Sequence, residues 1–242
     1  MSYVFRAEGI AKAFGDRQVL KNASVWGEGG KITTLMGRNG VGKSTLLRIA
    51  VGDLRADQGV VFFEAYVGER PSLARLASKG LFWVPQEQLL SRHYSVRDHL
   101  RAVEARFKTG RSQEAVEALG IVGTLDQRVS ELSGGERMRV SLALAVARRP
   151  TCLVIDEPFA RVAPKDQEVL GTALRSLTNE GTAVITSGHD ASVLLSVSDS
   201  IIWCVAGTTH HLGTPQQALQ HDQFVREYLG PGYASSGPRI QA

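Results

Sequence analysis

The sequence predicts an α/β fold with a parallel-sheet core, an antiparallel β region and an inserted helical lobe. The core is indicated by the second half of the chain, where helical patterns alternate with short apolar runs at residues 152–155, 183–186 and 200–205. Such alternation is typical of parallel strands joined by crossover helices, and the clearest of these helices is expected at residues 165–177.

The antiparallel region is expected near the N-terminus. Segments rich in β-forming residues lie at 3–6, 19–26 and 60–67, separated by glycine and polar turns. Between them, residues 32–36 form a short apolar strand that runs directly into a glycine-rich loop. A helix over residues 44–51 is expected after that loop.

A change of pattern near residue 87 predicts the helical lobe. Apolar residues there recur at helical spacing. They are Val96, Leu100, Val103 and Phe107, followed by Ala115, Val116 and Leu119. We therefore expect one domain over residues 1–230, with the core and β region at 1–86 and 132–230 and the helical lobe at 87–131. Residues 231–242, which include several Gly, Pro and Ser residues, are expected to form a flexible tail.

The composition narrows the class of protein. No apolar stretch approaches the roughly 20 residues of a membrane-spanning helix, so any link to a membrane is expected to come through a partner. Cys152 and Cys204 lie in apolar runs, which predicts buried free thiols and a cytoplasmic protein. The net charge of +4 is scattered along the chain rather than gathered in a basic stripe, so nucleic-acid binding is not expected.

The glycine-rich loop matches the pattern of a phosphate loop. Its residues are Gly37, Arg38, Asn39, Gly40, Val41, Gly42, Lys43 and Ser44, with Thr45 following. Glycines let backbone N–H groups turn toward phosphate oxygens, and the helix that follows points its positive end at them. Lys43 can then reach the β- and γ-phosphates of a nucleotide such as ATP, and Ser44 can bind Mg²⁺. The expected ligand of this loop is a nucleoside triphosphate.

A second motif places two acids after an apolar strand. Cys152–Ile155 is followed by Asp156 and Glu157. On its own this would be an ordinary strand with a polar turn. Beside a phosphate loop, Asp156 is expected to hold Mg²⁺, directly or through another group, and Glu157 to act as the general base that activates water.

A third motif opens a helix with Ser133, Gly134 and Gly135. This is a second helix N-terminus suited to an anion, and one chain does not need two such sites for one triphosphate. Two chains placed head to tail would use both. At this motif the chain resembles the ABC ATPases, P-loop NTPases with a RecA-like core, and the resemblance covers nearly the whole sequence.

The resemblance implies roles for three further residues. Phe14 matches the aromatic residue that stacks on adenine. Gln86 matches the glutamine that contacts Mg²⁺ or water and senses the membrane partner. His189 matches the histidine that contacts the γ-phosphate. The expected catalytic residues are therefore Glu157, Gln86 and His189. The expected Mg²⁺ ligands are Ser44, Gln86 and Asp156.

One position departs from the family pattern. Where similar members carry an aspartate that ties one ATP site to the other, this chain has Ala163. We hypothesise that Ala163 weakens the coupling between the two sites without abolishing hydrolysis, because the Mg²⁺ ligands and the base remain.

Several short stretches of the sequence are most similar to the ATPases of lipopolysaccharide export and branched-chain amino-acid import. That similarity lies at residues 85–87, 95–100, 156–160 and 225–230. It implies a subunit that dimerises around two Mg-ATP and drives a transmembrane permease from the inner face of the membrane. The dimer would be a homodimer or a heterodimer with a paralogous ATPase. The alternatives are a soluble ABC ATPase with an assembly or regulatory role, and a slow ATP-gated switch paired with a paralogue.

Overall fold

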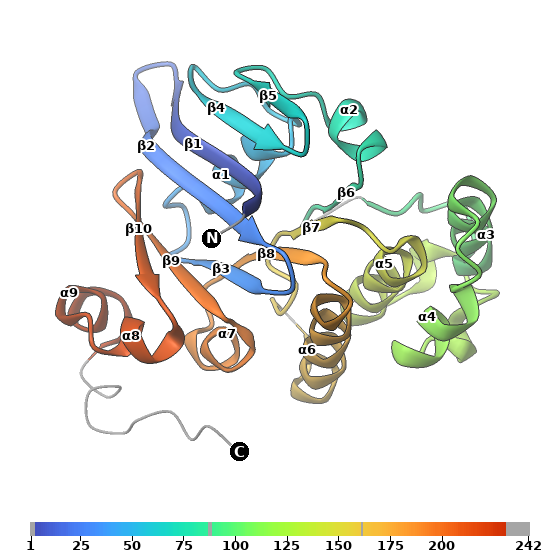
Figure 1. Cartoon of the computed structure of the whole chain (residues 1–242). Helices are drawn as coiled ribbons and strands as arrows, with labels where there is room; N and C mark the ends of the chain where they lie inside the picture. Colours follow the sequence, from blue (N-terminus) through green and yellow to red (C-terminus); the bar gives the residue numbers. More distant parts are fainter. Residues whose placement is uncertain (1–2, 87–88, 161, 231–242) are drawn as a thin grey trace.

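The computed structural model describes residues 3–86, 89–160 and 162–230. Across these residues, ten strands form one sheet in the order β5-β4-β1-β2-β10-β9-β3-β8-β7-β6 (Figure 1). The sheet is antiparallel at the β5 end and parallel from β9 to β6, as the sequence predicts. The expected tail, residues 231–242, lies outside the described residues.

The antiparallel part is a meander built on two long strands. Its strands are β1 (Tyr3–Phe14), β2 (Arg17–Glu28), β4 (Gln58–Phe63) and β5 (Tyr66–Gly68). The prediction of one β segment over residues 60–67 is wrong, because the chain turns between β4 and β5. Glu64 adopts a left-handed φ of 51° in that turn, and the two strands pair with each other. A β-rich run contains no direct sign of such a tight reversal when neither Gly nor Pro marks it.

The parallel part holds the strands that carry the motifs. They are β3 (Ile32–Met36), β6 (Leu81–Val84), β7 (Cys152–Ile155), β8 (Ala183–Gly188) and β9 (Ser200–Val205). A further strand, β10 (Thr208–Gly213), returns antiparallel to β9. Neither β6 nor β10 was expected from the sequence. Both are short, and β10 carries polar residues on an exposed surface.

Helices cover both faces of the parallel part, and a separate helical lobe stands beside it (Figure 1). The core helices are α1 (Lys43–Ala50), α2 (Leu73–Ser78), α5 (Gly134–Arg148), α6 (Pro164–Asn179) and α7 (Ala191–Val197). The lobe contains α3 (Val96–Phe107), α4 (Ser112–Ala118) and the 3₁₀ turns Val122–Thr124 and Val129–Glu131. The described chain ends with α8 (Pro215–Leu219), α9 (Asp222–Phe224) and the π-helical turn η3 (Val225–Leu229).

The two faces of the sheet bury two apolar clusters. Strand β7 shows the division clearly: Leu153 and Ile155 belong to one cluster, Cys152 and Val154 to the other. Burial on both faces explains why β7 is continuously apolar in sequence. Both cysteines are buried free thiols, which confirms that prediction. Within the described residues, no helix has the length and apolarity that crossing a membrane would need.

Candidate functional site

The register of the parallel strands gathers the motif residues at one edge of the sheet. Met36, the last residue of β3, pairs with Gly188 of β8, and Ile155 of β7 pairs with Thr186. The carboxyl ends of parallel strands meet at the same edge, where ligands of open α/β sheets bind. The phosphate loop after β3, the acids after β7 and His189 after β8 therefore lie together.

The phosphate loop is tightly wound around the side chain of Lys43. The Lys43 ammonium is buried and donates hydrogen bonds to the carbonyls of Gly37 at 2.8 Å and Arg38 at 3.1 Å. Gly42 has a φ of 110°, and a Cβ there would lie 2.8 Å from Cδ2 of Leu20. Only glycine fits such a position without strain, so the loop spacing reflects a steric requirement.

A buried carboxylate stands next to the loop. Asp156 is 3% exposed, and the Ser187 hydroxyl donates to its Oδ1. Burial raises the pKa of Asp156, while hydrogen bonds from Ser187 and Ser44 oppose that rise. A hydroxyl and a carboxylate oxygen in contact are the hard oxygen ligands that Mg²⁺ prefers, so Ser44 and Asp156 fit the expected metal.

Glu157 is the point at which the catalytic candidates meet. Its Oε1 lies 3.8 Å from the Lys43 ammonium and 3.6 Å from Nδ1 of His189, and its Oε2 accepts a hydrogen bond from Gln86 at 3.2 Å. The residue has a φ of 49°, a left-handed conformation that is uncommon outside glycine. Strained backbone of this kind clusters at functional sites. The fold thus brings together the three residues expected to be catalytic.

Two of the expected binding elements lie apart from this cluster. Phe14 ends β1, is 49% exposed, and has the Lys12 ammonium 5.4 Å from its ring centre. Ser133 caps α5: its hydroxyl accepts from the Glu136 amide at 3.2 Å, and its own amide donates to the Glu136 carboxylate at 2.8 Å. None of the contacts found in residues 3–86, 89–160 and 162–230 joins Ser133 to the phosphate loop of its own chain.

The α5 N-terminus is exposed on one side and contacts α6 on the other. Ser133 and Gly134 are exposed, and a Cβ on Gly135 would lie 3.3 Å from Oδ2 of Asp166 in α6. Arg139 lies 3.7 Å from the same Asp166 carboxylate. The first N–H groups of a helix lack partners within it, so this end offers donors to an anion outside the chain.

Ser187 is a site residue that the sequence analysis missed. Its hydroxyl accepts from the Glu157 amide at 3.0 Å while donating to Asp156, so it orients both acids. The signal that could have found it is its place at the carboxyl end of a predicted strand, next to the strand that ends in the acids.

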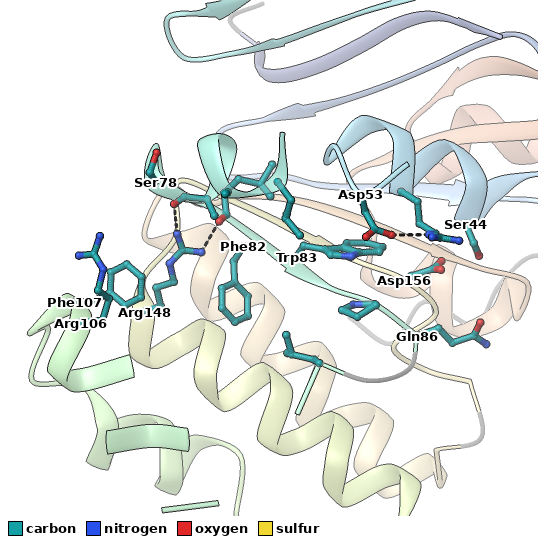
Figure 2. Close-up of a pocket in the computed structure, with 17 residues that line it drawn as sticks. Ser44, Asp53, Ser78, Phe82, Trp83, Gln86, Arg106, Phe107, Arg148 and Asp156 are labelled. Carbon is teal, nitrogen blue, oxygen red and sulfur yellow. Dashed lines mark hydrogen bonds and ion pairs between the residues drawn. The ribbon is translucent and has the colours of Figure 1, made fainter. Parts of the chain in front are cut away.

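A cleft of about 1110 Å³ leads away from the acids along β6. Ser44, Asp156 and Gln86 line one end, and Arg148, Arg106 and Phe107 line the other (Figure 2). The buried Arg148 guanidinium donates to the carbonyls of Ala77 and Leu81 and stacks on two aromatic rings, 5.2 Å from the centre of Phe82 and 4.7 Å from that of Phe107.

Burial of Arg148 and the nearby charge of Arg106 lower the pKa of its guanidinium to about 10. Among the described residues, no carboxylate pairs with Arg148. The end of the cleft away from Asp156 is therefore cationic and aromatic, whereas the other end is lined by Ser44, Gln86 and Asp156.

A phosphate loop on a parallel sheet, with acids that follow a second strand one strand further along the sheet, defines a P-loop NTPase. The chain belongs to the ABC transporter family, whose model matches residues 20–160. As a member of that family it is an ATP-binding ATPase.

The chain is similar to known proteins over nearly its full length. The lipopolysaccharide export system ATP-binding protein LptB of Haemophilus influenzae is 32% identical over 237 residues, covering 94% of this chain and 97% of the relative. The zinc import ATP-binding protein ZnuC of Halorhodospira halophila is 31% identical over 239 residues, covering 94% and 85%. The ADP conformation of MJ1267, an ATP-binding cassette of an ABC transporter, has a TM-score of 0.81 at 24% identity, covering 95% and 100%. The predicted fold and family are confirmed.

Proposed function

We propose that two copies of this chain close around two Mg-ATP and drive a membrane permease from the inner face of the membrane. The observation that carries the proposal is the exposed N-terminus of α5 at Ser133, which has no described contact with its own phosphate loop. In a head-to-tail dimer this helix end would bind the γ-phosphate of the ATP on the partner's loop.

The chemistry follows from the residues around Glu157. Lys43 and the loop amides bind the β- and γ-phosphates, and Ser44, Asp156 and Gln86 would hold Mg²⁺, whose charge neutralises phosphate oxygens. Glu157 accepts a proton from water as the water oxygen attacks the γ-phosphorus, the bond to the ADP oxygen breaks, and phosphate leaves. His189, beside Glu157, donates to a γ-phosphate oxygen.

The cleft supports a permease as the partner. It joins the nucleotide site to an opening between β6, α2 and the helical lobe, so a segment inserted there would contact Gln86 near one end. The cationic and aromatic far end, with Arg106, Phe107 and Arg148, suits a segment that carries an acidic side chain. The names of LptB and ZnuC place those relatives in export and import systems.

The Glu157→Gln variant tests the dimer. It keeps the size of the side chain and one of its two acceptor oxygens but removes the base, so hydrolysis should stop and ATP-bound dimers should accumulate. Light scattering after size exclusion, with ATP and Mg²⁺, should show twice the 26.2 kDa monomer mass.

The matched control adds Ser133→Arg to Glu157→Gln. This double variant keeps the phosphate loop and should bind ATP yet remain monomeric, because the arginine blocks the helix end. Equal dimer formation by the single and double variants would rule out a role for Ser133 across the interface.

A further inference from the structure

The last described turn of the chain touches two loops of the nucleotide site. Within η3, the carbonyl of Glu227 accepts a hydrogen bond from the Arg38 guanidinium of the phosphate loop at 2.7 Å. The next residue, Tyr228, donates its hydroxyl to the carbonyl of His189 at 2.9 Å. The turn is π-helical, a rare conformation that often marks functional positions.

This turn is anchored to the core by aromatic packing. Phe224 is fully buried, and its ring stacks on that of Tyr228 with centres 5.3 Å apart. Phe224 also meets the ring of Trp203 at 5.6 Å. Trp203 belongs to β9 and pairs with Met36 at the end of β3, where the phosphate loop begins. The position of Tyr228 relative to the phosphate loop is therefore fixed by this aromatic packing.

The carbonyl that Tyr228 binds belongs to a residue at the edge of the catalytic cluster. His189 directly follows β8, and its ring nitrogen Nδ1 lies 3.6 Å from the Glu157 carboxylate. Asp190, the next residue, accepts from the Ser192 amide at 3.1 Å and starts α7. The peptide carrying His189 thus has its orientation set from two sides, by Tyr228 and by the α7 cap.

We propose that Tyr228 is a positioning residue for ATP hydrolysis. Its hydroxyl holds the His189 carbonyl and thereby sets the imidazole at the distance from Glu157 and the γ-phosphate that the reaction needs. Through the Arg38–Glu227 hydrogen bond, the same turn couples the position of His189 to that of the phosphate loop. The inference rests on the role proposed above for His189 and extends it to the C-terminal turn.

The test is Tyr228→Phe, which removes the hydroxyl and keeps the ring on Phe224. Because one neutral hydrogen bond to the His189 carbonyl is lost, kcat should fall about 3- to 10-fold. The KM for ATP should stay within about twofold, since the substrate-binding loop is unchanged. Tyr94→Phe, at an exposed tyrosine of the helical lobe, is the matched control and should change neither constant.

A double-mutant cycle with His189→Ala separates positioning from simple stabilisation. If Tyr228 acts through His189, adding Tyr228→Phe to His189→Ala should cost nothing further. Single-turnover assays with enzyme in excess resolve the slow rates of these variants.

Three outcomes would overturn the inference: an unchanged kcat in Tyr228→Phe, an equal loss in both backgrounds, or wild-type kcat in His189→Ala. The last of these would also remove the proposed role of His189. Loss of activity in His189→Ala with none in Tyr228→Phe would reject the positioning role alone.

Discussion

At the scale of single residues, the interactions of the site converge on Glu157. Its carboxylate lies within 4 Å of Lys43, Gln86 and His189, while its amide donates to Ser187. A general base must be held where it can reach the attacking water, and four neighbours from three segments restrict its movement. The left-handed backbone of Glu157 is retained because these contacts determine it from several sides.

The exposed ring of Phe14 leads to a prediction about nucleotide affinity. If it stacks on adenine, Phe14→Ala should raise the KM for ATP roughly 5- to 150-fold, the equivalent of about 1–3 kcal/mol of base stacking. Phe14→Trp preserves an aromatic face and should stay near wild type. The measurement is steady-state ATPase activity against ATP concentration. An unchanged KM in the alanine variant would exclude stacking on Phe14.

At the scale of elements, the helices differ in how they begin. Helices α3 and α5 start with capping boxes at Ser95 and Ser133. Helix α6 starts at Pro164, and its N-cap residue Ala163 has an extended backbone but makes no side-chain hydrogen bond. A side-chain acceptor at the N-cap satisfies an otherwise unpaired amide of the first turn. The departure from the family pattern at Ala163 therefore also leaves α6 uncapped.

Ala163→Asp is expected to change both stability and coupling. The new carboxylate should cap α6 and raise the free energy of unfolding by about 0.5–2 kcal/mol, measured by denaturant titration. It should also increase cooperativity between the two ATP sites, measured as the Hill coefficient of ATPase activity. Ala163→Asn is the matched control, since it caps the helix without a charge. A Hill coefficient and rate in Ala163→Asp equal to wild type would count against the coupling hypothesis.

At the scale of the whole molecule, the cleft links the nucleotide site to the helical lobe. Strand β6 runs along it, so Gln86 near one end and Phe82 near the other belong to one continuous segment (Figure 2). A partner bound at the far end would therefore be connected to the Glu157 cluster through β6 and the two residues that follow it. Such a connection is what a transporter needs to couple closure to movement.

If a permease docks at the far end of the cleft, Phe107→Asp should release the protein from the membrane. Phe107 is 39% exposed beside Arg148, so a carboxylate there would pair with the arginines and remove the apolar contact offered to a permease. In cells that make the protein natively, the variant should move from the membrane to the soluble fraction on immunoblots. Val67→Asp, which changes another exposed apolar residue away from the cleft, should not. Thermal melting would verify that both variants fold, and retention of folded Phe107→Asp in the membrane fraction would contradict this docking site.

Elements that depend on interactions between residues close together in the chain could be predicted from the sequence. The phosphate loop could be recognised because its glycines, lysine and serine lie within eight consecutive residues, and the left-handed φ of 110° at Gly42 favours glycine on local grounds. The same holds for Ser133, whose capping box with Glu136 spans one helical turn. The continuous apolar run Cys152–Ile155 likewise predicted a strand, and all four residues of β7 are buried.

Which distant residues act together depends on how the elements pack in three dimensions. Ser187 reaches both acids because β8 pairs with β7 in one register, and a shift of a single residue would point its side chain to the other face. Tyr228 reaches His189 across 39 positions of sequence, and Arg148 reaches the carbonyl of Leu81 across 67. Such pairings depend on packing between elements, which leaves no periodic or local pattern in the chain from which they could be predicted.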